Sequence, residues 1–338
     1  MPKTFNHLYR QIADFDNLLA AYRKARRGHR FTREVLRYSA NLEEELIALH
    51  NELTWQTYRT GDYRTFMVFE PKQRQISALP FRDRVAHHAI CNIIEPLFEK
   101  KFIKDSYGCR VDRGTHAGSD RLQQFLRIAQ RNWPQVYCMK LDISRFFPSV
   151  NRESLKRILR RTIRCQDTLK LLDSIIDHGP ETGIPIGNLT SQLFANIYLD
   201  QLDHFCKEVL RLKYYVRYMD DVIVLHHDKR HLHGCMDLIR NYLETELQLN
   251  LNPKSGIFPA PTGVDFLGYK TWASHRKLRK RFLKGIRRKL RKKRPHRLTA
   301  SIASWIGHAK RINAQQAVIN ILQEASCTTI LSLQPGNI

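Results

Sequence analysis

Acidic residues are scarce in this sequence compared with basic ones. Its 338 residues include 32 Asp and Glu against 57 Lys and Arg, which gives a formal net charge of +25 and an isoelectric point of about 10.0. Self-repulsion at such a charge opposes folding, and a polyanionic partner would relieve it. Nucleic acid is the commonest partner of this kind. The charge balance therefore favours a nucleic-acid-binding protein over one whose basic surface serves solubility alone.

Long apolar runs and paired cysteines are also missing. No stretch approaches the ~20 apolar residues that a membrane span needs, and the N-terminal segment MPKTFNHLYRQ lacks the apolar core of a signal peptide. The seven cysteines are scattered and never form a C-x-x-C pair, which argues against a disulfide framework and a structural zinc site. We expect a cytoplasmic protein with no membrane partner, whose cysteines are small buried residues.

The hydrophobic pattern predicts helices and strands in irregular alternation. Residues 1–60 repeat apolar side chains at helical spacing, and residues 62–80 alternate like a hairpin that turns at Glu70-Pro71. Further strands are expected in QVYCMKLD, YYVRYMDDVIVL and GVDFLGYKTW, with helices between them. Because regular βαβ alternation is absent, we predict an α+β fold whose sheet is covered by helices on one face.

Three aspartates stand where strands are expected. Asp220 and Asp221 interrupt the apolar run YYVRYMDDVIVL, and Asp142 ends the apolar run VYCMKLD, although Asp is depleted in strands. If the two strands are antiparallel neighbours, the three carboxylates converge into an oxygen-rich site that suits Mg²⁺. Two such ions about 4 Å apart support in-line phosphoryl transfer. The alternative is that Asp220 and Asp221 form a turn and Asp142 caps the next helix.

The segments around these aspartates resemble the motifs of reverse transcriptases. YMDD (218–221) is similar to their catalytic box, and LDISRFFPSV (141–150) to the catalytic motif before it. GIPIGNLTSQLFANIYL (183–199) resembles the loop and helix that position template and nucleotide. LQLNLNPKSG (247–256) resembles the segment with a lysine near the incoming triphosphate, and FLGY (266–269) resembles the primer grip.

Two upstream segments extend the resemblance to group II intron-like bacterial enzymes. Residues 63–90 and 105–118 are similar to the fingers motifs of those enzymes. One four-letter motif can occur by chance, whereas seven motifs in the right order identify the sequence as a member of the family.

The positioning loop resembles one branch of that family. Most group II intron-like relatives carry Gln-Gly-x-x-x-Ser-Pro there, whereas this sequence has IGNLTSQ from Ile186 to Gln192. An aliphatic residue before the glycine and glutamine in place of proline resemble the reverse transcriptases of diversity-generating retroelements. This resemblance implies a bacterial or phage-encoded enzyme that copies a template-repeat RNA into cDNA with errors at template adenines. It also implies a small, basic, oligomeric accessory protein as a partner.

The resemblance implies a right-hand polymerase. Its parts would be fingers, a palm with an antiparallel sheet backed by helices, and a helical thumb. The expected division is an N-terminal helical extension at 1–60, fingers with part of the palm at 61–135, the palm with the catalytic aspartates at 136–271, and a basic helical thumb at 272–338.

The same resemblance implies the metal ligands. The carboxylates of Asp142, Asp220 and Asp221 and the backbone carbonyl of Ile143 would bind two Mg²⁺ ions, with Mn²⁺ as a possible substitute. Asp142 and Asp220 would bridge both ions, and Asp221 would be more peripheral. Lys254 would protonate or neutralise the leaving pyrophosphate, unless it is simply a turn lysine.

Six residues are implied to contact the incoming dNTP: Lys72, Arg74, Phe147, Ile186, Gly187 and Gln192. Lys72 and Arg74 would bind the triphosphate, or else they are solvated hairpin charges. Phe147 would collide with a ribose 2′-hydroxyl, unless it is a core aromatic like Phe146. Ile186 offers only apolar contact to the nascent base pair, and apolar shape discriminates by only ~1–3 kcal/mol. We hypothesise that Ile186 lowers fidelity; the alternative is an ordinary packing residue.

The template RNA and the RNA/cDNA hybrid are expected to contact seven residues: Arg110, Phe266, Leu267, Gly268, Arg287, Arg288 and Lys292. Residues 276–297 contain 14 Lys or Arg and no acidic residue. A stripe that runs from Leu278 to Leu290 predicts an amphipathic helix along the hybrid backbone. A face that recruits the accessory protein or structured RNA is the competing interpretation.

Three alternative functions stay open. They are a group II intron-like reverse transcriptase of ordinary fidelity, a phage-defence or retron-type reverse transcriptase, and a non-catalytic RNA-binding protein on a polymerase fold. The intact set of Asp142, Asp220 and Asp221 argues against the last of these.

Overall fold

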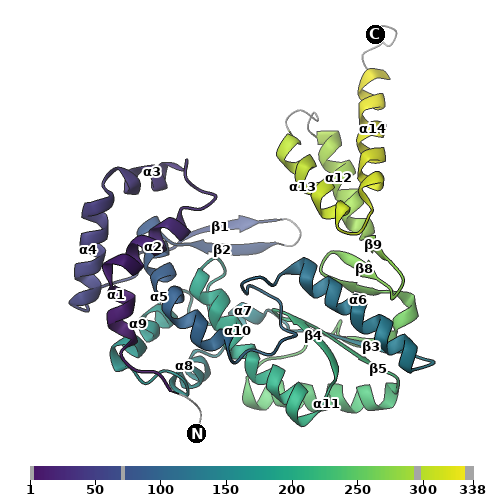
Figure 1. Cartoon of the computed structure of the whole chain (residues 1–338), viewed down its shortest axis with the longest axis horizontal. Coiled ribbons are helices and arrows are strands. Elements are labelled where there is room, and N and C mark those ends of the chain that lie inside the picture. The colour runs from purple at the N-terminus through teal and green to yellow at the C-terminus, as the bar shows by residue number, and fades with distance from the viewer. Residues whose placement is uncertain (1–3, 70–72, 293–297, 332–338) are drawn as a thin grey trace.

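The chain begins with a group of helices that confirms the helical prediction for residues 1–60. The computed structural model describes residues 4–69, 73–292 and 298–331 (Figure 1). The first helices are α1 (Leu8–Ala13), α2 (Phe15–Ala25), α3 (Arg33–Ala40) and α4 (Leu42–Thr54). The side chain of Asp14 accepts hydrogen bonds from the first-turn backbone N–H groups of α2, which caps that helix. Buried leucines of these helices share one core with the long helix α5 (Phe81–Glu99).

A two-stranded hairpin extends away from this helical group (Figure 1). It pairs β1 (Arg64–Val68) with β2 (Arg74–Ala78) in antiparallel register, as the alternation of residues 62–80 predicts. The expected turn at Glu70-Pro71 lies outside the described residues. After α5, the helix α6 (Thr115–Asn132) leads into the central sheet.

The central sheet has four antiparallel strands in the order β4-β5-β3-β6. Its strands are β3 (Tyr137–Asp142), β4 (Tyr214–Tyr218), β5 (Asp221–His226) and β6 (Gly256–Pro259). The helices around it are α7 (Phe146–Ser149), α8 (Arg152–Arg160), α9 (Gln166–Asp177), α10 (Leu189–His204), the π-helical η1 (Phe205–Val209) and α11 (Lys229–Glu246). The antiparallel sheet with interspersed helices confirms the predicted α+β class.

Helices cover both faces of this sheet, so the prediction of one covered face is wrong. On one face, Cys138 and Ile223 pack in a cluster with α6. On the other face, Met139 and Val224 belong to the larger core that includes α10 and α11. Successive strand residues point to opposite faces, and most residues of β3, β4 and β5 are apolar and buried. Both faces of the sheet therefore carry apolar side chains that must be packed against helices.

The C-terminal part forms a third hydrophobic cluster, around Tyr269, Ile286 and Trp305. Its elements are the 3-10 turn η2 (Ala260–Thr262), β7 (Val264–Phe266), β8 (Tyr269–Thr271), β9 (Arg276–Leu278), α12 (Lys280–Lys292), α13 (Thr299–Lys310) and α14 (Gln315–Leu331). Figure 1 shows α12, α13 and α14 gathered beyond β8 and β9. Leu278 was expected in the basic helix but belongs to β9, where it pairs with Tyr269. The four-part division of the chain stays a prediction.

Membrane-spanning helices were sought in the described ranges. None of the helices there is both long and apolar enough to cross a bilayer.

Candidate active site

Two aspartates face each other where β3 ends and β5 begins. Asp142 is the last residue of β3 and Asp221 the first of β5, and the antiparallel register pairs them directly. The predicted pairing of the two strands is confirmed. Asp220 lies one residue earlier, in the two-residue turn that Met219 begins and that closes the β4–β5 hairpin. The turn bends sharply because Met219 adopts a left-handed backbone conformation with φ 52°.

Asp142 is fixed by the segment that precedes β6. Its carboxylate accepts a hydrogen bond from the Asn252 side chain at 2.9 Å, and its backbone carbonyl accepts one from the Asn252 backbone at 2.7 Å. Its backbone N–H donates to the Ser255 hydroxyl at 3.1 Å. Sequence reasoning missed Asn252, although it stands two residues before Lys254 in the segment LQLNLNPKSG. Its place as a short polar residue close to the motif lysine could have identified Asn252 from the sequence.

Asp221 is a half-buried carboxylate with incomplete hydrogen bonding. One of its oxygens, Oδ1, is buried and has no hydrogen-bond partner, and the other lies 3.5 Å from the Lys140 ammonium group. Its pKa is raised to about 6, mainly by burial and also by the charges of Asp142 and Asp220, while the Lys140 charge acts in the opposite direction. The site therefore holds more negative charge than its own side chains compensate, which favours a bound cation.

This pKa predicts how stability changes with pH. Because the pKa of Asp221 is higher in the folded chain than in the unfolded chain, the folded chain binds more protons between about pH 4 and 6. The free energy of unfolding therefore falls as pH rises through this window. Asp221→Asn cannot ionise, so we expect it to raise the free energy of unfolding by about 1–2 kcal/mol at about pH 8.

Urea unfolding in EDTA buffer measures this difference. The difference should become small near pH 4, where Asp221 is protonated in the folded chain and about half protonated in the unfolded chain. Asp237→Asn is a suitable control, since Asp237 only forms an exposed pair with Arg240 on α11. A stabilisation that is equally large at both pH values would contradict the assignment to Asp221.

A cavity of about 910 Å³ lies against the carboxylates. Its lining includes six of the predicted site residues, which are Arg74, Asp142, Ile143, Phe147, Ile186 and Asp220. Phe146 and Phe147 both line the cavity, with Phe147 half-buried and Phe146 in the core at 2% exposure. The burial of Phe146 agrees with a structural role, and the ligand contact of Phe147 stays a prediction.

Two backbone contacts hold the positioning loop against the cavity. The Ser77 N–H of β2 donates to the Ile186 carbonyl at 2.8 Å, and the Ile184 N–H donates to the Phe147 carbonyl at 2.9 Å. Gly187 has φ 130°, and a Cβ there would lie 2.5 Å from the Ser77 carbonyl oxygen. Only glycine fits this close approach. Gln192 lies half-buried on the first turn of α10, next along the chain.

The two predicted phosphate lysines are not part of the described cavity wall. Lys254 is exposed in the turn before β6, where its backbone N–H donates to the Asn252 side chain at 3.0 Å. Lys72 lies outside the described residues.

Arg110 does not lie at a template surface, so its prediction as a template contact needs correction. Its side chain is 3% exposed and forms an ion pair with Glu99 at 2.6 Å. The same guanidinium donates to the backbone carbonyls of Ile103 and Ser106. A guanidinium buried in this way stabilises the loop that follows α5 and is not exposed to a phosphate at the surface.

The FLGY segment forms the tight turn between β7 and β8. Leu267 and Gly268 are at its tip, with φ 51° and 91°. The Phe266 side chain is 0% exposed in the second cluster, so a direct side-chain contact with the primer is wrong for Phe266. Lys140 was also missed by sequence reasoning. Its ammonium group donates to the Asp265 carbonyl at 2.7 Å and therefore ties this hairpin to Asp221.

The predicted hybrid-binding residues of the thumb lie on α12. Arg287 is about half exposed and lies 3.3 Å from Glu324 of α14. Arg288 is exposed on the same helix, and Lys292 is its last residue. The helix is amphipathic, with Ile286 buried in the third cluster.

The donor set at the carboxylates fits a hard divalent cation. All candidate ligands are oxygens, and the unpartnered Oδ1 of Asp221 is directed at no protein donor. Within the described ranges, however, no group of three or more His, Cys, Asp or Glu side chains is arranged so that it could hold a metal ion. The two-ion site stays a prediction.

Comparison with known proteins identifies related chains. The sequence pattern of the family described as "Reverse transcriptase (RNA-dependent DNA polymerase)" matches residues 69–271. Protein YkfC of Escherichia coli is 26% identical over 288 residues, which cover 72% of this chain and 73% of YkfC. The group II intron-encoded protein LtrA of Lactococcus lactis is 25% identical over 227 residues, which cover 62% of this chain but only 36% of LtrA.

Among solved structures, a telomerase from Candida albicans, in complex with a fragment of telomeric RNA, has a similar fold. The TM-score is 0.51 at 11% identity, with 84% of this chain and 57% of the telomerase chain covered. This likeness and the matched family pattern confirm the predicted right-hand polymerase fold, with its antiparallel palm sheet backed by helices.

Proposed function

This chain belongs to the reverse transcriptase family of RNA-dependent DNA polymerases, and from that premise we propose that it copies a template-repeat RNA into cDNA for a diversity-generating retroelement. One observation carries the proposal. Asp142, Asp220, Phe147, Ile186 and Arg74 line one cavity. We assign Phe147 to the ribose, Ile186 to the base pair and Arg74 to the triphosphate. A bound nucleotide needs contacts to its sugar, its base and its phosphates at the same time.

The carboxylates of Asp142, Asp220 and Asp221 and the carbonyl of Ile143 would hold two Mg²⁺ ions, with Mn²⁺ as a substitute. When bound, these ions activate the primer 3′-hydroxyl and neutralise charge on the leaving pyrophosphate. The unpartnered Asp221 oxygen and its raised pKa support this assignment. Asn252 keeps Asp142 oriented toward the paired strand.

The nucleotide is proposed to lie between the fingers hairpin and the palm. Arg74 and Lys72 of the hairpin would bind the triphosphate, and Lys254 would meet the pyrophosphate as it leaves. Gly187 and Gln192 would line the base-pair side with Ile186. The Ser77–Ile186 backbone bond supports this arrangement, because it joins the hairpin to the positioning loop.

The hybrid is proposed to run from the β7–β8 turn to α12. Leu267 and Gly268 at the turn would touch the primer end, and Arg287, Arg288 and Lys292 would bind backbone phosphates. The positive charge of α12 supports its proposed contact with backbone phosphates, because the exposed face of this helix is strongly basic. Binding through phosphates should weaken steeply with salt.

Retroelement function is proposed from the segment IGNLTSQ. Ile186 lines the cavity where a polar side chain would otherwise check the nascent base pair. We expect Ile186→Gln to reduce misincorporation opposite template adenine by about 10-fold, since buried polar recognition discriminates more strongly than apolar shape. Sequencing of cDNA made on a defined RNA template measures the error rate at each base.

Ile186→Val is the matched control, because it keeps an apolar wall of nearly the same shape. Its error rate should stay close to that of wild type. If Ile186→Gln copies adenine with unchanged errors, Ile186 has no part in fidelity.

Primer extension on an RNA template with Mg²⁺ and dNTPs tests the proposed function as a whole. Errors concentrated at template adenines favour the retroelement enzyme. Evenly distributed, rare errors favour a group II intron-like enzyme of ordinary fidelity. A cDNA attached to protein or to a structured RNA favours a phage-defence or retron-type enzyme. RNA binding without extension favours the non-catalytic protein.

The proposed setting is the bacterial cytoplasm, with a small, basic, oligomeric accessory protein as partner. Bacterial relatives such as YkfC and LtrA and the unpaired cysteines support the setting. The accessory protein is expected from the retroelement resemblance alone.

A further inference from the structure

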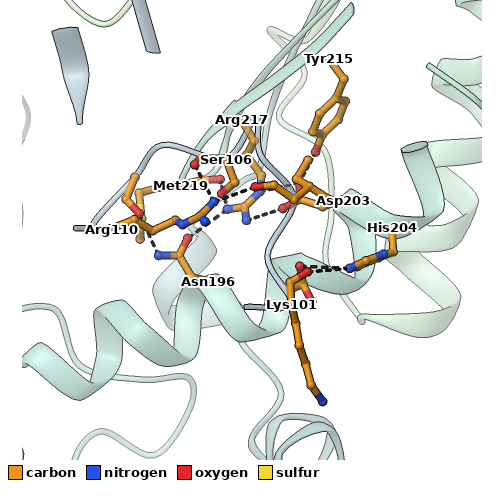
Figure 2. A network of polar contacts seen from close by, with 12 residues as sticks. Lys101, Ser106, Arg110, Asn196, Asp203, His204, Tyr215, Arg217 and Met219 are labelled. Atoms are coloured by element: carbon orange, nitrogen blue, oxygen red, sulfur yellow. Dashed lines mark hydrogen bonds and ion pairs between the residues drawn. The ribbon is translucent and has the colours of Figure 1, made fainter. Parts of the chain in front are cut away.

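Arg217 lies at the centre of a buried polar network beneath the Met219–Asp220 turn (Figure 2). It stands on β4, and its side chain and that of Asp203 on α10 are both 0% exposed. The guanidinium donates to both carboxylate oxygens of Asp203, from Nε at 2.7 Å and from Nη2 at 2.6 Å. A two-point contact of this kind fixes the orientation of the guanidinium plane as well as its position.

The remaining nitrogen of Arg217 reaches the turn itself. Its Nη1 donates to the Met219 carbonyl at 3.1 Å and to the Asn196 side-chain oxygen at 3.3 Å. The Met219 carbonyl belongs to the peptide bond that leads into Asp220. Arg217 therefore holds the backbone at the residue where the carboxylate-bearing turn begins.

Gly108 lies close against Met219 of the same turn. Its carbonyl accepts a hydrogen bond from the Asn196 side chain at 2.8 Å. A Cβ at Gly108 would lie 2.6 Å from the Met219 backbone nitrogen and side chain. The loop of Gly108 is itself attached to β4, because the Tyr107 N–H donates to the Arg217 carbonyl at 2.9 Å.

Stability alone does not account for such a network. A buried ion pair often contributes no more to stability than apolar residues of the same size. What the network supplies is a fixed hydrogen bond to the Met219 carbonyl, next to a glycine that leaves room for the Met219 backbone and side chain.

We propose that Arg217, anchored by Asp203, is a positioning residue that sets the Met219–Asp220 turn so that Asp220 and Asp221 face Asp142. Gly108 contributes by leaving the space that Met219 occupies in this position. This inference rests on the proposed polymerase function for its kinetic test, but the position of the turn can be measured without activity.

Gly108→Ala tests the contact directly, since it adds one methyl group against Met219. We expect kcat for primer extension to fall about 100-fold, because a displacement near 1 Å at reacting groups costs about this much. The KM for dNTP should change less than about 3-fold, since the binding wall is untouched. Gly234→Ala is the matched control, because nothing lies within 4 Å of a Cβ there, and its kcat should equal that of wild type.

Arg217→Lys tests the guanidinium. Lysine keeps the charge opposite Asp203 but has one nitrogen, so it cannot hold both Asp203 oxygens and the Met219 carbonyl. We expect kcat to fall about 10-fold or more at an unchanged KM for dNTP. Arg160→Lys is the matched control, since Arg160 is also an arginine paired with an aspartate, Asp173, but lies on α8. Its kcat should stay within about 2-fold of wild type.

The position of the turn is read from the ¹³C-methyl signal of Met219. The chain has five methionines, so a Met219→Leu sample assigns the signal. In Gly108→Ala and Arg217→Lys this signal should shift, and its broadening by Mn²⁺ should change, at temperatures far below unfolding. In Gly234→Ala and Arg160→Lys both should match wild type.

Two results would overturn the proposal. One is a Met219 signal that stays in place in both Gly108→Ala and Arg217→Lys. The other is a shifted signal with kcat within about 2-fold of wild type. If Arg217→Lys does not fold, Gly108→Ala alone decides by the same criteria. A wild-type chain that extends no primer would refute the proposed function instead, and the Met219 signal would still report whether Arg217 holds the turn.

Discussion

Asp142→Asn is expected to reduce kcat for primer extension by about 10³-fold or more while RNA binding stays near the wild-type level. Asp142 contributes a carboxylate directly opposite Asp221, and a cation held between them would supply several kcal/mol of charge stabilisation during transfer. Asparagine has the same shape but no charge. The fold should tolerate it, because the backbone bonds from Asp142 to Asn252 and Ser255 do not involve the carboxylate.

Primer extension and filter binding of labelled template RNA, measured on the same preparation, test this expectation. Asp237→Asn provides the matched control at an exposed position of α11, and it should change neither measurement. Robust DNA synthesis by Asp142→Asn would refute the polymerase assignment of the whole site.

Phe147→Ala is expected to raise ribonucleotide use relative to deoxyribonucleotide use by about 10–100-fold. The ring lines the cavity while Phe146 supports it from the core, with ring centroids 5.4 Å apart at an edge-to-face angle. A supported ring cannot move aside for a 2′-hydroxyl. Loss of a steric contact of this size changes discrimination by roughly 1–3 kcal/mol.

Single-nucleotide incorporation kinetics with dATP and ATP opposite the same template base give the selectivity ratio. Phe147→Tyr keeps the ring and should keep the wild-type ratio. If Phe147→Ala loses activity toward both nucleotides without a change in their ratio, Phe147 is a packing residue.

The local parts of the site were predictable from the sequence. The apolar arms around Asp220 and Asp221 are long enough to define a hairpin, and the apolar strand that ends at Asp142 could pair only where its carboxylate met them. The division between Phe146 and Phe147 also followed, because only one of two adjacent residues can point into the core.

The orientation of isolated polar residues was not predictable in the same way. Arg110 and Arg217 look alike in sequence to the surface arginines of α12, yet both are buried in ion pairs. Their carboxylate partners, Glu99 and Asp203, lie 11 and 14 residues away on helices that pack only in the folded chain. A buried arginine can be identified only when its carboxylate partner is known, and tertiary structure brings the two together. Phe266 was misjudged for the corresponding reason, since a motif predicts where the backbone turns and not which side chain faces outward.

The place of β3 in the sheet has a consequence for how the chain is made. β3 lies between β5 and β6, and both are synthesised after it, with Asp221 79 residues beyond Asp142. A nascent chain therefore exposes β3 with both edges unpaired while most of the palm is still being translated. Unpaired apolar edges are where growing chains associate wrongly. The strand that carries the first carboxylate therefore needs protection at the ribosome, and α6, which is synthesised before β3 and shares a hydrophobic cluster with Cys138, provides a surface that can cover one of its faces.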